Sequence, residues 1–140
     1  MDAVARAHGY VLGFAVIGAW GTILFWALAL RFTRYEETPT FWHAVSVAQV
    51  LLALQFLAGL VLVAFWLVGD GQPPGANAGG GWFNGTFHLL YGVGFPLVVL
   101  LVGHRVASTG QYNPHSVFAT VGLVIFGLTA RAFLVGAGGP

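Results

Sequence analysis

The stretch from Phe83 to Arg105 carries no charged side chain before its final arginine, and it holds a histidine near each end, His88 and His104. A helix needs about 20 apolar residues, each rising about 1.5 Å, to cross the hydrocarbon core of a bilayer. This stretch has that length. Histidine inside such a segment is costly, so it marks a functional site by default. The stretch therefore predicts a membrane-spanning helix with a candidate functional residue near each end.

The composition supports a membrane protein and excludes several classes of function. The 140 residues are 58% hydrophobic and only 6% charged, which is too little charge to solvate a soluble surface. A net charge of +1 provides no basic patch for nucleic acid. The absence of cysteine excludes disulfides, thiolate metal sites and thiol–disulfide chemistry. We also expect no cleavable targeting segment, because the first apolar run is too long for a signal peptide.

Charge-free runs predict one all-α domain, residues 1–140, with four transmembrane helices in an antiparallel up-down bundle. The connections are a short charged segment, a linker rich in glycine and proline, and a short polar turn. The expected helices cover about residues 4–31, 39–69, 83–105 and 114–135.

The arginines give the bundle an orientation. Arg31, Arg34 and Arg105 lie at one end, and Arg6 and Arg131 lie at the other. By the positive-inside rule the first end faces the cytoplasm, which leaves both termini outside. A lysine-free composition rich in alanine and glycine indicates a bacterial protein, and hence the bacterial inner (cytoplasmic) membrane.

The histidines sort into two pairs when the direction of each helix is followed. His8 and His88 begin the first and third helices at the outer side, and His43 and His104 lie at the inner side, with His115 nearby. Paired imidazoles from different helices are the arrangement that binds the iron of a b-type haem. Two such haems would be separated by about 24 Å along the helix axis.

Helix geometry favours one haem over two. His88 and His104 are sixteen residues apart, which places them roughly 160° apart around a regular helix. They would then face different neighbours. The outer pair has the better setting, because Gly92 follows one turn after His88 and would let a macrocycle approach the backbone. Arg131 lies at a similar depth and could pair with a haem propionate.

Each of these polar residues also has a simpler explanation. Histidine at a helix end can be hydrated in the interface, and we expect this of His115. Arg131 can be an interfacial anchor. Gln49 and Gln55 can be interhelical hydrogen-bonding residues or quinone ligands.

Two segments resemble known proteins: Gln49–Val61 (QVLLALQFLAGLV) and His88–Arg105 (HLLYGVGFPLVVLLVGHR). They are similar to small four-helix b-haem membrane proteins, namely cytochrome b561-type bundles and one half of haem A synthase. The resemblance implies a haem held between helices, exchanging electrons with quinol or a partner cytochrome. His43 has no glutamate three residues upstream, which speaks against haem A synthesis.

Other classes fit less well. A proton-coupled transporter needs an intramembrane carboxylate, and the acids all lie in the tail or connectors. A zinc site would have imidazoles only, without local spacing, and a hydrolase would need an acid to orient His43 beside Ser46. The main rival is an accessory transmembrane subunit of a larger respiratory or photosynthetic complex, packed by its many aromatic residues. Whether the protein is a redox enzyme component stays open at this point.

Overall fold

The computed structural model describes residues 2–33, 39–69 and 81–136, and all regular structure in these ranges is helical. The elements are α1 (Asp2–Arg6), the π-helical turn η1 (Ala7–Leu12), α2 (Gly13–Thr33), α3 (Pro39–Leu67), α4 (Gly81–Leu89), the π-helical turn η3 (Leu90–Gly94), α5 (Phe95–Ser108) and α6 (Pro114–Gly136). Most of the charged connector and most of the glycine-rich linker expected from the sequence lie outside the described residues, and the first three residues of the connector end α2.

Four continuous helical segments are long and apolar enough to cross a membrane: Ala3–Thr33, Pro39–Leu67, Phe83–Ser108 and Pro114–Gly136. The prediction of an all-α chain with four such helices is therefore confirmed for the described residues. Pro39 and Pro114 are the first residues of α3 and α6, where a missing N–H costs no hydrogen bond.

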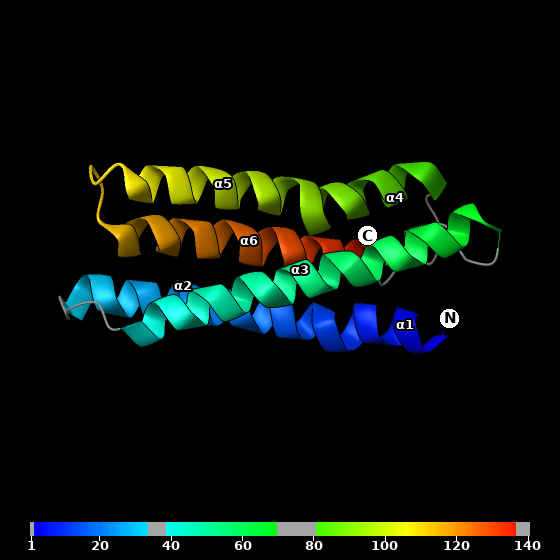
Figure 1. Ribbon diagram of the computed structural model, residues 1–140, viewed down its shortest axis with the longest axis horizontal. Helices are drawn as coiled ribbons and strands as arrows, with labels where there is room; N and C mark the ends of the chain where they lie inside the picture. Colours follow the sequence, from blue (N-terminus) through cyan, green and yellow to red (C-terminus); the bar gives the residue numbers. More distant parts are fainter. Residues whose placement is uncertain (1, 34–38, 70–80, 137–140) are drawn as a thin grey trace.

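The four segments run back and forth along the long axis of the molecule, and α1 begins toward the same end at which α6 finishes (Figure 1). The main helix contact joins α2 and α6. Helix α3 packs on α2, and its first turns also contact α6 through Phe41 and Trp42, whereas α5 packs on α6. The π-helical turn η1 contacts α3, whereas α4 and η3 contact α6. The end where α1 begins therefore brings together residues from all four segments.

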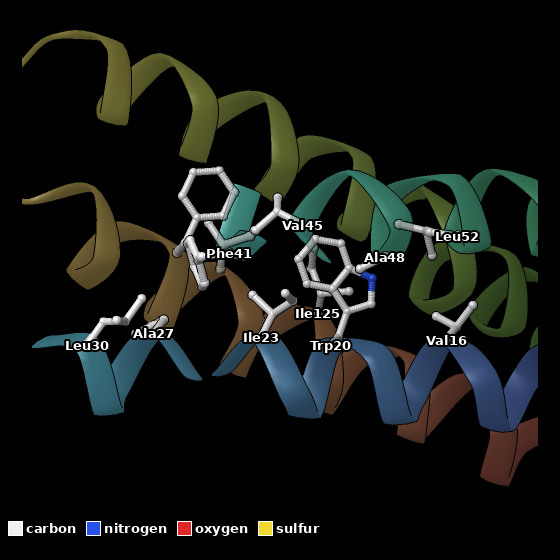
Figure 2. Close-up of a cluster of buried hydrophobic side chains, with 13 residues drawn as sticks. Val16, Trp20, Ile23, Ala27, Leu30, Phe41, Val45, Ala48, Leu52 and Ile125 are labelled. Atoms are coloured by element: carbon white, nitrogen blue, oxygen red, sulfur yellow. The ribbon is translucent and has the colours of Figure 1, made fainter. Parts of the chain in front are cut away.

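The core lies where α2, α3 and α6 meet, and Figure 2 shows its buried side chains. Trp20 of α2, Phe41 of α3 and Ile125 of α6 are all completely buried there. Close contact between α2 and α6 depends on a glycine, because a Cβ on Gly122 would lie 3.0 Å from the backbone nitrogen of Leu24. Small residues that let helix backbones approach are typical of helix packing in membranes.

The segments Pro39–Leu67 and Phe83–Ser108 expose most of their apolar surface. In the most apolar window of α3 only 6% of residues are buried, against 39% in the windows of α2 and of α6. Leu57, Leu60 and Phe65 of α3 are examples of exposed apolar side chains. A surface of this kind suits contact with lipid or with other apolar helices.

Candidate functional site

His8 and His88, the predicted outer pair, lie next to each other in the structure. His8 lies in η1 and His88 in α4. The centroids of their imidazole rings are 5.9 Å apart, and the ring planes make an angle of 69°. Both residues are half-buried. Two helices from opposite parts of the chain thus place two imidazoles within one site.

Both rings are hydrogen-bonded to a backbone carbonyl of a neighbouring helix. Nδ1 of His8 lies 3.2 Å from the carbonyl oxygen of Gln55 in α3. Nδ1 of His88 lies 3.0 Å from the carbonyl oxygen of Ala132 in α6. Because a carbonyl only accepts, each Nδ1 must carry the proton and donate it. In the neutral imidazole this leaves a free lone pair on Nε2, the atom that can bind a metal.

A glycine lies one helical turn after each acceptor carbonyl and contacts the same ring. A Cβ on Gly59 would be 3.1 Å from Cε1 of His8, and a Cβ on Gly136 would be 2.9 Å from Cε1 of His88. Residues i and i+4 share one helix face, so carbonyl and glycine meet the imidazole together. Each histidine therefore lies against a carbonyl–glycine pair, which we define as Gln55 with Gly59 and Ala132 with Gly136.

The two π-helical turns are both at this site. η1 contains His8, and η3 begins two residues after His88. Pro96 lies in the first turn of α5, directly after η3. Proline lacks an N–H and clashes with the carbonyl four residues earlier, here Gly92, so a widened turn at that place accommodates it. π-Helical turns occur frequently at functional sites.

The π turn η3 corrects one expectation from the sequence. The 160° separation of His88 and His104 assumed a regular α-helix throughout, and that assumption is wrong because Leu90–Gly94 is π-helical. At Gly92, a Cβ would lie 3.7 Å from Cβ of Ala132, so η3 packs against α6 there.

Two neutral imidazoles from different helices are the donor type that a b-type haem iron takes. In the structure the two rings are in edge-on contact, with centroids 5.9 Å apart and planes at 69°.

The inner histidines are arranged differently. The structure does not bring the rings of His43 and His104 together: His43 is exposed, and Nε2 of His104 accepts a hydrogen bond from the amide of Gln49 at 2.7 Å. His104 also packs edge-on against Phe118, with ring centroids 5.3 Å apart. One of the expected roles of Gln49, an interhelical hydrogen bond, is therefore observed, here between α3 and α5.

His115 is not a hydrated interfacial residue, and that expectation is wrong. It is only 5% exposed, because its ring stacks on Trp42 and lies edge-on to Phe41. The first turn of α6 carries it directly into the aromatic part of the core.

Arg131 and two apolar grooves are the remaining features that could belong to a binding site. Arg131 is exposed on α6, one residue before the carbonyl that binds His88. One groove of about 500 Å³ lies between α5 and α6, and another of about 600 Å³ lies along α2 beside Phe126. Neither is lined by a histidine. Within the described ranges no three histidine, aspartate or glutamate side chains gather into a metal site, so the candidate site is the His8–His88 pair.

The sequence prediction did not identify the carbonyl–glycine pairs. A backbone carbonyl leaves no trace in the residue type, so Gln55 and Ala132 could not be chosen as acceptors. Gly59 and Gly136 could have been predicted from the sequence, because both lie on the other two helices at the same depth as the outer histidines. Comparisons of the chain with protein-family models, with curated proteins and with solved structures found no match.

Proposed function

We propose that this protein is an integral membrane b-type haem protein, with His8 and His88 as the two axial ligands of one haem. The observation that carries the proposal is the pair itself: two imidazoles from different helices, 5.9 Å apart, each with Nδ1 bound to a carbonyl. This pattern of a ligating histidine fixed through its other ring nitrogen is common in metal sites.

The proposed setting is a bacterial inner membrane, with four antiparallel spans and both termini outside. Arg31 and Arg105 lie in the last turns of α2 and α5, and by the positive-inside rule they support this orientation. The haem would then lie in the outer half of the bilayer, between helices that exclude water.

The proposed activity is electron transfer within or across the bilayer, to or from quinone or a partner cytochrome. A bound b-type haem supplies one-electron exchange between ferric and ferrous iron. The chain's own residues hold and orient the group: His8 and His88 bind from two sides, and the Gln55 and Ala132 carbonyls fix their tautomer. Arg131 is the residue we propose as the partner of a propionate.

One haem per chain is the stoichiometry that we propose. At the inner end, Nε2 of His104 is engaged by Gln49 and His43 is exposed on another helix. An imidazole whose Nε2 accepts a hydrogen bond must lose that bond before it can bind iron. In the outer pair the hydrogen bonds are made by Nδ1, which supports the choice of this pair.

The test is a visible spectrum of detergent-purified protein, reduced with dithionite minus oxidised in air, together with a pyridine haemochrome assay. We expect a sharp b-type band and one haem per chain. His88→Ala should remove the band, whereas the matched variant His104→Ala in the same helical segment should retain it. No band from protein expressed with ample haem would overturn the proposal.

The alternative function is an accessory subunit without a cofactor of its own. The exposed apolar surface of α3 favours it, because such a surface suits a neighbouring membrane subunit as well as lipid. A colourless purified protein that co-purifies with a larger complex would support this alternative.

A further inference from the structure

The groove of about 500 Å³ between α5 and α6 is lined mostly by valines from both helices. At its bottom the helices touch, because a Cβ on Gly103 would collide with Cγ2 of Val121. Val102 of α5 and Val124 of α6 are exposed, so one side of the groove is open to the surroundings. Valine has one strongly preferred rotamer in a helix. The groove therefore loses little side-chain freedom when it takes up an occupant.

The groove has the length of one bilayer leaflet. On α5 its lining residues extend from Val98 to Val106, which are eight positions apart, and eight rises of about 1.5 Å give about 12 Å. Half of a hydrocarbon core of about 30 Å is about 15 Å. On α6 the lining extends from Ser116, in the first turn, to Val124. The groove thus starts at one end of both helices and stops near the middle of the span, as a lipid acyl chain does.

A cation and two hydroxyl groups lie at the end of the groove near the α5–α6 turn. Tyr112 and Ser116 line the groove there. Arg105 is exposed in the last turn of α5. It follows Val98 by seven residues and Val102 by three, which places it on the groove face of the helix. Within the described ranges it makes no ion pair. An arginine with neighbouring hydroxyl donors is suited to a phosphate group.

We propose that this groove binds one anionic phospholipid, with an acyl chain between α5 and α6 and the phosphate at Arg105. The inference rests on the membrane setting of the proposed function and is independent of the haem. By the positive-inside rule the Arg105 end faces the cytoplasm, and basic sites between spanning helices on that side bind anionic head groups. A partner's spanning helix fits less well, because it would extend over about 30 Å and the groove covers only about half of that.

The experiment is native mass spectrometry of the detergent-purified protein, titrated with palmitoyl-oleoyl phosphatidylglycerol and, separately, with phosphatidylcholine of the same acyl chains. We expect one tightly bound phosphatidylglycerol per chain. Phosphatidylcholine has the same chains but no net charge, and it should bind about fivefold more weakly, which is the contribution of one basic residue near an anionic surface. Equal affinity for the two lipids would overturn the proposal.

Charge variants test the phosphate end. Arg105→Gln should lower the affinity for phosphatidylglycerol about fivefold, to the level of phosphatidylcholine, and Arg105→Lys should retain most of it. Arg31→Gln is the matched control, because Arg31 is also exposed in the last turn of its helix and does not line the groove. The control should bind both lipids as the wild-type protein does. Equal losses in Arg31→Gln and Arg105→Gln would contradict a site at Arg105.

A second pair of variants tests the apolar part. Val102→Trp fills the groove from an exposed position and should remove the bound lipid, whereas Leu101→Trp alters the neighbouring exposed residue outside the groove and should retain it. Lipid retained by Val102→Trp, or a wild-type dimer that this variant dissociates, would overturn the inference. A protein that binds this lipid but no haem would overturn only the proposed function. A haem-bound protein without the lipid would overturn only this inference.

Discussion

The two ends of the molecule contain the same residue type and use it differently. At the end where α1 begins, the rings of His8 and His88 are in edge-on contact, and each donates its Nδ1 proton to a backbone carbonyl. At the other end, His104 is bound by Gln49 and His115 is buried among aromatic rings. The difference lies in the neighbours: carbonyls and glycines at one end, an amide and large rings at the other. What surrounds an imidazole decides whether it can be a ligand.

The largest expected effect is on haem content, and it tests the difference between the two ends directly. His8→Ala should eliminate bound haem, because a single remaining imidazole leaves the iron with one protein ligand. His43→Ala is the matched control, since His43 also lies near the start of its helix but is exposed. Haem per chain, measured by the pyridine haemochrome assay, distinguishes the two. Equal loss in both variants would show that the inner end also binds haem.

A second prediction concerns glycines that contact backbone instead of histidine. Gly122→Val should destabilise the fold by about 1–3 kcal/mol, as overpacking of a tight contact does, because Gly122 lies against the backbone of Leu24. Gly18→Val, with open space around its Cβ, is the control. The measurement is the free energy of unfolding in mixed detergent. A similar loss in both variants would contradict the assigned contact.

The two glutamines of α3 provide a smaller effect. Gln49→Leu should cost about 0.6 kcal/mol, the average for a hydrogen bond between membrane helices, and should leave haem content unchanged. Gln55→Leu should cost less, because Oε1 of Gln55 is buried without a hydrogen-bond partner among the described residues. Its carbonyl, which binds His8, is unaffected by the substitution. A haem loss in Gln49→Leu would place the inner end in the functional site.

The smallest effect is expected at Trp20. Its Nε1 is completely buried and has no hydrogen-bond partner in the described part of the chain. A buried donor without a partner carries a desolvation cost of about 1–3 kcal/mol. Trp20→Phe removes that donor and some packing area, so we expect near-neutral stability in the same unfolding measurement. A loss comparable with that of Gly122→Val would indicate a partner for the indole N–H.

The sequence was sufficient for the helices and for placing His8 and His88 at the same end of the molecule, and insufficient for the carbonyls and glycines that contact their rings. Charge-free length determines a span, and helix direction determines which end a residue occupies. The direction in which each side chain points around its helix was harder to predict, because the π turns η1 and η3 change it. Apart from Pro96, no residue in the sequence indicates these turns. The burial of His115 was also missed, since it depends on Phe41 and Trp42 from another helix.

The π turn η3 has a consequence for changes of chain length. A π-helical turn holds one residue more than an α-helical turn, so deleting one residue from Leu90–Gly94 would restore a regular helix and rotate everything before it by about 100°. His88 could then no longer face Ala132 while Gly103 still contacts Val121 farther along the same segment. The extra residue of the π turn changes the rotation between the two halves of the segment, so that His88 lies against Ala132 while Gly103 lies against Val121. Among natural variants of this chain, we therefore expect substitutions in the turn to be tolerated more readily than single-residue deletions.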